Sequence, residues 1–598
     1  MKIPFPQQNK AYVQNNRSNV FPKGNLWSTF NVDLQSNQGA LRISPRLKVG
    51  ASTADDADLG CPVAFKEYNS KIWAICDTHI FTNAGEPQDP WSDDATTGFQ
   101  VDYSADDSDL EIFNATLCAT TVDALYSTDG SNWTSRDVLG VGTSHVMTYF
   151  KKFDRLYYAN QSDNILSIST GWVTADPGTD YAISLSTSSS QYQVTCMESD
   201  SSYVWIGVVD ALSNGSPGKV LQWDGIAPQI SNEYGVNNAQ GILAMALNPT
   251  DGLMYVMDSN GVVSSFNGSG FKEEGRLPFP PNRLPFNIAD TDNEKFIHPN
   301  GMYFTRNGTL RCLINNRSAL STNAVVENMP SGIWEWSRDN GFVHIQSFSY
   351  NPLASSTITD FGQNRIARVG AIASMSVPST TIIDGTLMAG ASLYSNASSV
   401  TNVIAFDNSL DTIQKKGYLV TDWFESDEIA DSWDTWWMSY RKFLDSGDNI
   451  TVKYRLTEAA PVEGAITWVN TTSFTVLNSA VVVSNYWTSG TGGEVEILRG
   501  TGGGSCVHIT NAVNNAGTWT VTIDEAVTGV TTGTATARFQ HWIKLFPTEA
   551  LTTPRNWGQF AINTGSEPRI QVKVCFTYTG EGEFYKSILT SNGDIKTQ

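Results

Sequence analysis

One stretch of the chain, residues 253–271 (LMYVMDSNGVVSSFNGSGF), constrains the fold more than any other. It contains two short apolar runs rich in β-branched and aromatic residues, and Asn260 and Gly261 stand between them. An Asn-Gly pair tolerates the positive φ angles of a tight turn, so the stretch predicts a β-hairpin. The same alternation of apolar run and turn recurs over most of the chain, which predicts an all-β protein.

Composition agrees with this expectation. Aromatic residues make up 11% of the chain and charged residues only 16%, and there are 48 glycines for turns. Strands favour aromatic and β-branched residues, so this mixture is typical of β structure. With 598 residues the chain is too long for a single hydrophobic core, and we expect more than one domain.

Strand-turn-strand units repeat between residues 51 and 415, where helical periodicity is hard to find. The clearest units cover residues 61–81, 117–133, 146–168, 203–223, 253–271, 302–314 and 332–348. A spacing of about 50 to 60 residues is expected when each unit is a four-stranded blade of a β-propeller. We therefore predict a degenerate propeller over 51–415, with about six or seven blades.

Residues 1–50 form a polar arm with Pro4, Pro6, Pro22 and Pro45, and only residues 41–49 have the pattern of a strand. Such a segment has to be held either by the body of the protein or by a neighbouring subunit. Its polarity and proline content lead us to expect that it reaches a neighbouring subunit.

A β-sandwich is predicted for residues 416–459 together with 538–598. Residues 450–456 alternate strictly, with Ile450, Val452, Tyr454 and Leu456 facing inward; we expect Thr451, Lys453 and Arg455 to face water. Residues 433–443 are apolar on both faces and are expected to form a central strand covered on both sides. The Gly/Thr/Val-rich segment 460–537 is predicted to be a small β-barrel or sandwich inserted into this domain.

The charge balance limits what the chain can bind. It carries 60 acidic and 38 basic residues, a net charge of −22, and no cluster of Lys and Arg. Tight gripping of phosphates requires clustered cations, so a nucleic-acid-binding surface of that kind is not expected. An acidic surface suits a wall along which DNA moves without sticking, and it equally serves solubility.

The seven cysteines are scattered singly, and we expect buried apolar side chains rather than disulfides or a zinc site. The N-terminal residues lack an apolar segment, and no run of apolar residues is long enough to span a bilayer. We therefore expect neither a secretory signal nor a membrane span.

Residues 127–133 (STDGSNW) resemble the Asp-box of sialidases and related propellers, S-x-D-x-G-x-x-W, with one residue fewer between Asp and Gly. The matching residues are Ser127, Asp129, Gly130 and Trp133. In that motif the Asp ties a hairpin turn and the Trp packs between strands. The resemblance therefore implies a structural role within a propeller.

Other polar groups give no catalytic pattern. The acidic clusters at 55–58, 106–109 and 290–294 could supply oxygen ligands to calcium, but none has the spacing of an EF-hand, and solvated loops are the preferred interpretation. The arginines are scattered, without the cluster that a sialidase needs for its substrate carboxylate.

The six histidines, His79, His145, His298, His344, His508 and His541, lie far apart in sequence and are interpreted as core or surface residues. Residues 500–504 (GTGGG) lack the Lys and the helix of a phosphate-binding loop and are interpreted as a turn. We therefore predict no catalytic residues, no metal and no cofactor, and expect that the chain is not an enzyme.

Several segments carry a family resemblance. Residues 39–47 (GALRISPRL) are similar to the segment by which many phage tail proteins enter their first propeller blade. Residues 493–500 (GEVEILRG), 506–509 (CVHI) and 522–525 (TIDE) resemble a small β-module of phage tail polypeptides. With its architecture, the chain resembles virion tail proteins of tailed bacteriophages, in particular the nozzle or tail tubular proteins of short-tailed phages.

This resemblance implies a structural virion protein, made in the host cytoplasm and located in the tail. Copies, six by the family's pattern, would form a ring of the DNA-ejection conduit, in contact with portal, adaptor and tail fibre proteins and with passing DNA. Two alternatives stay open. The chain could be a receptor-binding or baseplate protein whose inserted domain touches the host, or a carbohydrate-active propeller enzyme.

Overall fold

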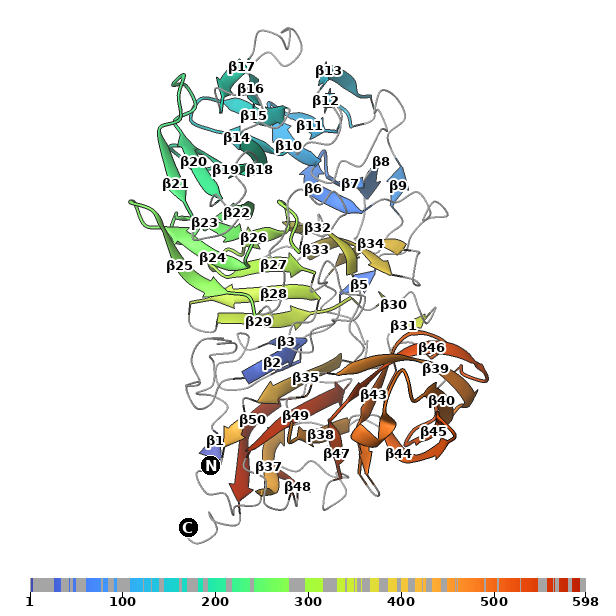
Figure 1. Ribbon diagram of the computed structural model, residues 1–598. Helices are drawn as coiled ribbons and strands as arrows, with labels where there is room; N and C mark the ends of the chain where they lie inside the picture. The colour runs from blue at the N-terminus through green and yellow to red at the C-terminus, as the bar shows by residue number, and fades with distance from the viewer. Residues whose placement is uncertain are drawn as a thin grey trace.

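A computed structural model describes the fold (Figure 1). The residues that it describes are 2–3, 26–33, 42–43, 47–49, 61–76, 79–83, 91–93, 108–121, 123–130, 132–138, 145–160, 164–168, 181–185, 192–210, 218–236, 241–278, 296–315, 331–338, 341–348, 350–351, 356–357, 366–375, 386–394, 400–406, 415–421, 423–425, 433–441, 449–457, 459, 461–488, 491–502, 505–527, 529–546, 557–562, 564, 569–578 and 583–591. The fold is all-β, as predicted; within these ranges the one helical element is the 3₁₀ turn η3 (Val483–Asn485).

Seven four-stranded antiparallel sheets form a β-propeller. The first six are built from consecutive strands: β6 (Pro62–Tyr68), β7 (Lys71–Cys76), β8 (His79–Asn83) and β9 (Ser92–Asp93); β10 (Asp109–Phe113), β11 (Thr116–Thr120), β12 (Asp123–Ser127) and β13 (Thr134–Val138); β14 (Met147–Phe150), β15 (Arg155–Asn160), β16 (Asn164–Ile168) and β17 (Tyr181–Ser184); β18 (Tyr192–Ser199), β19 (Val204–Asp210), β20 (Lys219–Trp223) and β21 (Asn232–Gly235); β22 (Ile242–Leu247), β23 (Met254–Asp258), β24 (Val262–Phe266) and β25 (Phe271–Arg276); β26 (Met302–Phe304), β27 (Leu310–Ile314), β28 (Gly332–Ser337) and β29 (Gly341–Gln346). A short hairpin of β30 (Tyr350–Asn351) and β31 (Ser356–Thr357) follows the sixth blade.

The seventh blade joins both ends of the propeller sequence. It consists of β32 (Ile366–Met375), β33 (Thr386–Tyr394) and β34 (Val400–Phe406), and the N-terminal strand β5 (Lys48–Val49) pairs with β34 as the outer strand. The first strand of each blade contacts the first strand of the next, and β32 contacts β6. The ring is therefore closed, which leaves no inner edge exposed.

The hairpin predicted at residues 253–271 is the centre of blade five. Strands β23 and β24 pair directly, and Gly261 in their turn has a φ of 74°. The Asp258 carboxylate accepts the backbone N–H groups of Asn260 (2.8 Å) and Val262 (3.0 Å). An Asp side chain that bonds the next backbone groups fixes a turn, so the local sequence determines this element without help from distant residues.

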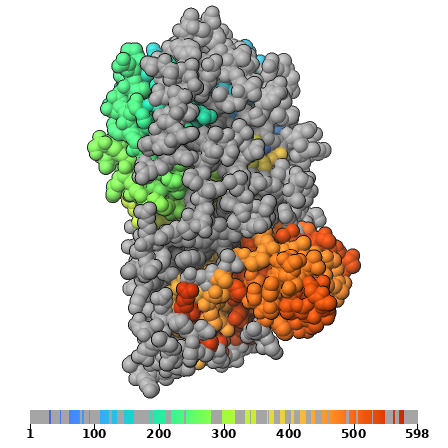
Figure 2. Space-filling view, viewed as in Figure 1, coloured from blue at the N-terminus to red at the C-terminus, as the bar shows by residue number. Residues whose placement is uncertain are grey.

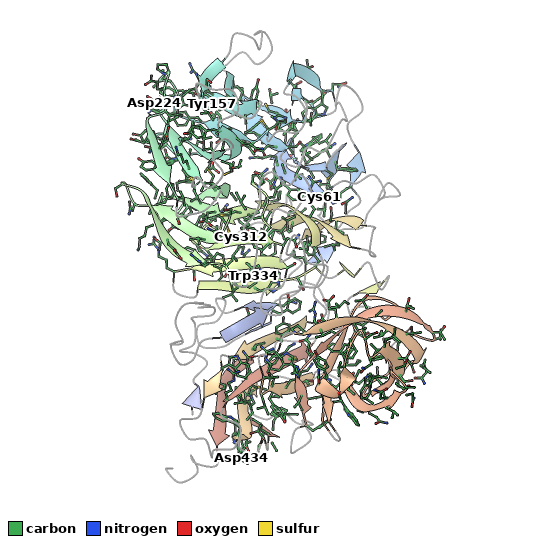
Figure 3. The ribbon with its side chains drawn as sticks, in the orientation of Figure 1. Cys61, Tyr157, Asp224, Cys312, Trp334 and Asp434 are labelled. Carbon is green, nitrogen blue, oxygen red and sulfur yellow. The ribbon has the colours of Figure 1, made fainter. Side chains whose placement is uncertain are left out.

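Side chains fill the space between blades (Figure 3). Tyr157 of blade three lies against Trp223 of blade four, with ring centroids 5.1 Å apart, and its hydroxyl donates to the carbonyl of Gly225 at 2.8 Å. Six of the seven cysteines are buried, as expected for small apolar side chains, and Cys506 is half-buried. Interdigitated packing of this kind holds neighbouring blades in a fixed register.

The second domain is a β-sandwich of two sheets around one core. One sheet has the order β2 (Leu26–Phe30), β35 (Lys415–Thr421), β49 (Arg569–Tyr578), β38 (Asn449–Arg455) and β47 (Ile543–Leu545), with β36 (Phe424–Glu425) also paired to β49. The other has the order β1 (Lys2–Ile3), β50 (Glu583–Ser591), β37 (Trp433–Arg441) and β48 (Trp557–Ala561). The core between them includes Trp436, Val452 and Phe576.

The inserted segment is a closed six-stranded barrel. Its strands, in spatial order, are β39 (Val462–Asn470), β40 (Ser473–Leu477), β45 (Thr518–Ile523), β44 (Cys506–Asn515), β43 (Glu494–Gly500) and β46 (Gly533–Gln540), with the small hairpin β41 (Trp487–Thr488) and β42 (Thr491–Gly492) beside them. Figure 2 shows it as a rounded mass that stands out from the side of the body.

The N-terminal arm differs from expectation. Strand β1 pairs with β50, β2 pairs with β35, and β5 pairs with β34, all within the same chain. In this single chain the body of the protein therefore holds these strands, and the expected reach of the arm to a neighbouring subunit stays a prediction. The prediction of a single strand over residues 41–49 is wrong. Strand β4 (Arg42–Ile43) pairs with β3 (Val32–Asp33), whereas β5 joins the last blade.

Two predictions about the sandwich need correction. Lys453 and Arg455 point away from the core as predicted, but they are buried, with exposed fractions of 3% and 8%. Aromatic side chains and the inserted barrel cover this face instead of water. Strand β37 is central in its sheet, but Trp437 is only half-buried, so its outer face is not fully covered.

Strand β2 lies between the propeller and the sandwich (Figure 1). The ring of Phe30 stacks on His344 of blade six (5.0 Å between centroids) and on Tyr418 of β35 (5.2 Å). The next residue, Asn31, donates its backbone N–H to His344 Nδ1 at 3.0 Å. Because Phe30 and His344 have no exposed surface, this contact joins the two domains through a dry interface.

We predict that Phe30→Ala uncouples the two domains. Loss of a buried aromatic ring costs about 3–5 kcal/mol, and here the cavity would open between domains rather than inside one of them. Calorimetry should resolve separate propeller and sandwich transitions that are merged in the unmodified protein. Phe474→Ala, an equally buried residue of the barrel core, is the control and should lower stability without this separation. Unchanged melting of Phe30→Ala would contradict the role given to strand β2.

Candidate functional site near the propeller axis

A cluster of charged side chains lies on the innermost propeller strands. Lys66 comes from blade one, Glu111 from blade two and Glu198 from blade four. The Lys66 ammonium contacts both carboxylate oxygens of Glu111, at 3.0 and 3.1 Å. Glu198 interacts electrostatically with Lys66 and Glu111, although they belong to blades that are not its neighbours. Side chains from different blades therefore converge near the axis.

Asp109 and Asn300 tie this cluster to the surrounding backbone. Asp109 accepts the N–H of Met147 in blade three (2.9 Å) and the side-chain amide of Asn300 (3.0 Å). The same amide also donates to the carbonyl of Val63 (3.1 Å), and the carbonyl of Asn300 accepts the N–H of Ile372 in blade seven (2.9 Å). One asparagine before β26 therefore links four blades around the axis.

The environment shifts the pKa values of the two carboxyl groups upward. Burial raises the pKa of Asp109 to about 6, against the hydrogen bond from Met147 and the attraction of Lys66. Burial raises the pKa of Glu198 to about 7, and Glu111 and Asp109 add to that rise. Among the described residues Lys66 is the lysine that acts on Asp109 and Glu198, and its attraction is too weak to offset their burial. The cluster can hold and exchange protons near neutral pH.

A second charged cluster lies where the barrel meets the sandwich. Glu494 of the barrel contacts Lys453 and Lys573 of the sandwich, the latter at 3.3 Å, and all three side chains are buried. Burial alone would raise the pKa of Glu494, but the two lysines hold it well below its ordinary value. His508 lies 3.8 Å from Glu494, and Asp524 accepts its backbone N–H at 2.7 Å. The arrangement is an ionic lock between domains.

Cys506 lies beside this lock, 3.8 Å from the Lys453 ammonium. Burial raises the pKa of its thiol well above the ordinary value. A thiol needs to ionise before it can act as a nucleophile, so this environment does not activate Cys506 for catalysis.

The Asp-box-like residues fix the turn between β12 and β13. Ser127 donates to Asp129 (3.0 Å) and accepts the N–H of Gly130 (2.8 Å), while Asp129 accepts the N–H of Asn132 (2.9 Å). The indole of Trp133 donates to the carbonyl of Gly130 at 3.1 Å and packs in a buried cluster. These hydrogen bonds are all made within the turn, which is a structural arrangement.

The remaining sequence candidates are dispersed. Asp109 is buried, so the solvated-loop interpretation of that cluster is wrong for this residue, whereas residues 55–58, 106–107 and 290–294 lie outside the described residues. Across the described ranges no group of three His, Cys, Asp or Glu side chains could hold a metal ion. Gly500 ends strand β43 and Gly502 lies in the turn that follows, with φ angles of 87° and 81°.

Four of the six histidines, His145, His298, His344 and His508, are buried, in keeping with the core interpretation. His145, for example, lies 3.3 Å from the carbonyl of Ala159. His541 stacks on Tyr486 with ring centroids 4.6 Å apart, and the side chain of His79 lies outside the description. The contact of His508 with the ionic lock was not foreseen from sequence.

Sequence reasoning missed the axial cluster. Its only signal was the presence of charged residues inside otherwise apolar runs, Lys66 in VAFKEY and Glu111 in DLEIF. Such residues are usually interpreted as the solvated face of a strand. Their convergence depends on the ring of blades, which the sequence pattern does not place in space.

Comparisons with known proteins identify no family for this chain. No family model matches the chain, and no curated protein matches it. Among solved structures it is similar to streptogramin B lyase (12% identity, TM-score 0.35, covering 58% of this chain and 93% of that chain). It is also similar to the WD40 β-propeller domain of Doa1 (9% identity, TM-score 0.35, covering 59% of this chain and 94% of that chain). At these scores the likenesses carry no inference about activity or partners.

Across the described residues no helix is long and apolar enough to cross a membrane.

We predict that Gly130→Ala destabilises the propeller strongly. Gly130 has a φ of 84°, and a Cβ atom there would lie 2.1 Å from the ring of Trp73. Strain and overpacking together should cost about 2–4 kcal/mol, measured by chemical denaturation. Gly268→Ala is the matched control, because its φ is 92° but nothing lies within 4 Å. The Gly268→Ala variant should lose only the free energy of holding an alanine at a positive φ, about 1–2 kcal/mol. Equal losses for the two variants would contradict the packing argument.

We predict that Glu198→Gln changes how propeller stability depends on pH. A carboxyl group with a raised folded pKa binds an extra proton in the folded state between its unfolded pKa of 4.5 and its folded value of about 7. Stability from this group is therefore highest at the acidic end of that window and is lost as pH rises through it. The neutral amide should raise the melting temperature of the propeller by about 2–4 °C at high pH and leave it unchanged at low pH. Exposed Glu273→Gln should have no such effect. An unaltered pH profile in Glu198→Gln would refute the assignment.

Proposed function

We propose that this chain is a structural protein of a bacteriophage tail, whose copies form a ring of the DNA-ejection conduit below portal and adaptor. The observation that carries the proposal is the joint at strand β2, where Phe30 is stacked between His344 of the propeller and Tyr418 of the sandwich. A conduit wall has to keep its domains in fixed positions while DNA moves along it. A dry aromatic joint of this kind favours a rigid building block.

The placement of charge supports the same proposal. The chain has a net charge of −22, and three of its lysines, Lys66, Lys453 and Lys573, contact carboxylates of the same chain, the last two in buried positions. Cations that are engaged internally are not available to phosphates, and an acidic surface repels DNA at short range. Both properties suit a wall that lets DNA pass. The segments at 39–47 and 493–500 add the family resemblance described above.

A receptor-binding or baseplate protein is the second candidate. The observation that favours it is the position of the inserted barrel, which stands out from the body and could reach an external surface (Figure 2). Removal of the barrel would then abolish adsorption while particles remain complete.

A carbohydrate-active propeller enzyme is the third candidate. Asp109 and Glu198 favour it, because a carboxyl group with a pKa near neutrality is suited to act as a general acid. Turnover by the purified protein on a broad glycan panel would support this candidate over a structural role.

Electron microscopy of the parent particle, with a gold-labelled antibody raised against the purified chain, tests the proposal. We expect label where the tail meets the capsid. Label at the outer tips of the tail would favour receptor binding instead. Particles without label, together with detection of the chain elsewhere in infected cells, would reject both virion roles.

A further inference from the structure

Two long stretches of the inserted barrel carry no charged residue. Residues 465–493 and 500–523 contain no Asp, Glu, Lys or Arg. Among the barrel charges whose side chains the structure describes, Glu494 contacts Lys453 and Lys573 of the sandwich, Asp524 and Glu525 contact Lys544, and Arg538 contacts Glu463 and Glu496. These two stretches give the barrel a surface built from uncharged residues, here called its neutral part, in a chain whose net charge is −22.

Four adjacent strands form a continuous outer surface in this neutral part. In one row, Thr467 of β39 is opposite Thr475 of β40, which is opposite Thr520 of β45, which is opposite Val513 of β44. In the next row, Leu477 is opposite Thr518, which is opposite Asn515. Directly opposed residues point to the same side of a sheet, so these seven residues share one face, here named the neutral barrel face.

This face also concentrates exposed aliphatic side chains. Two of its seven residues, Leu477 and Val513, have exposed fractions of 57% and 49%, and elsewhere on the barrel Val469, Val462 and Val482 are exposed as well. Among the described residues, only two other large hydrophobic side chains are exposed, Ile226 and Phe546. Exposed apolar groups gathered without charge are the composition of an interface core rather than of a solvated surface.

The chemistry of the face limits its partner. It offers no cation for a phosphate or a nucleic acid. Its exposed apolar residues are aliphatic, so it lacks the aromatic platform on which bases and sugar rings stack. The barrel is closed, so it has no free edge for an added strand. A protein surface that is also poor in charge is the partner that fits.

We propose that the neutral barrel face is a contact between copies of this chain. Two copies with a charge of −22 each repel one another over most of their surfaces, so they can meet where that charge is absent. A partner of opposite charge would instead bind the acidic surfaces. The inference deepens the proposed function and rests on it, because a ring requires a surface at which its copies meet.

The size of the face sets the strength of the contact. Strands about 4.8 Å apart that rise about 3.3 Å per residue give four strands of six residues an area of about 400 Å². A stable pairwise interface buries about 800 Å² on each partner. A single contact is therefore weak, and a closed ring would strengthen it by repeating it in every subunit.

Sedimentation velocity of the purified full chain tests the proposal, over a range of protein concentrations at low and moderate salt. We expect weak, reversible association that strengthens with salt, because ions screen the repulsion between acidic copies while a neutral contact is unaffected. Leu477→Glu and Val513→Glu should each weaken association at least tenfold. Ile226→Glu is the matched control, since Ile226 on the propeller is 56% exposed against 57% for Leu477, and it should leave association unchanged.

Three results would overturn the inference: no association at any concentration, association that salt weakens, or equal loss in Leu477→Glu and Ile226→Glu. Circular dichroism of each variant shows whether the barrel has kept its fold, and Thr475→Glu on the same face provides a second charged variant. Gold label at the tail with association insensitive to these variants would leave the proposed function standing and reject this surface. Association through the face without label on any particle would reject the function and retain the surface.

Discussion

The stacking of Phe30 between His344 and Tyr418 is the interaction on which the arrangement of the domains depends. The same line of contacts continues in both directions. Trp334 packs edge-on against His344 within blade six, and on the other side the Lys573 ammonium lies 4.5 Å from the ring of Tyr418. Lys573 in turn contacts Glu494 of the barrel. One series of rings and charges therefore connects propeller, sandwich and barrel.

The same series explains why the outer face of the sandwich sheet is dry. Arg455 lies 4.5 Å from the ring of Trp542, and Lys453 contacts Glu494, so each buried cation has either an aromatic face or a carboxylate to replace lost water. Burial of charges is costly, and removal of one partner leaves the other uncompensated. Such contacts add little stability for their number, but they penalise any other placement of the barrel on the sandwich.

Features that depend on residues close together in sequence could be predicted. Features that depend on closure of the propeller ring or on contact between domains could not. Asn260 and Gly261 were sufficient to place a hairpin, and the alternation from Ile450 to Tyr454 was sufficient to orient a strand, because both are decided within a few residues. The burial of Lys453 and the pairing of the N-terminal strands depend on residues far away in the sequence. Lys453 is buried by a domain inserted after it, and β5 completes a blade whose other strands follow more than three hundred residues later. The axial cluster was missed for the same reason, since Lys66 and Glu198 meet only when the ring closes.

The pKa values of carboxyl groups are raised in the axial cluster and lowered in the cluster at the barrel junction, because the two clusters contain different ratios of lysines to carboxyl groups. At the axis, Lys66 contacts Glu111 and attracts Asp109 and Glu198, and among the described residues no second lysine acts on the last two, so burial leaves both with raised pKa values. At the barrel junction, two lysines surround Glu494 and lower its pKa. Burial therefore has opposite results in the two places: the charges of the junction are held over the ordinary pH range, while the axis holds protons that leave near neutrality. A joint that has to stay closed between domains requires the first arrangement. The second is tolerable only where blades on all sides fix the backbone, so that the fold does not depend on which carboxyl group carries the proton.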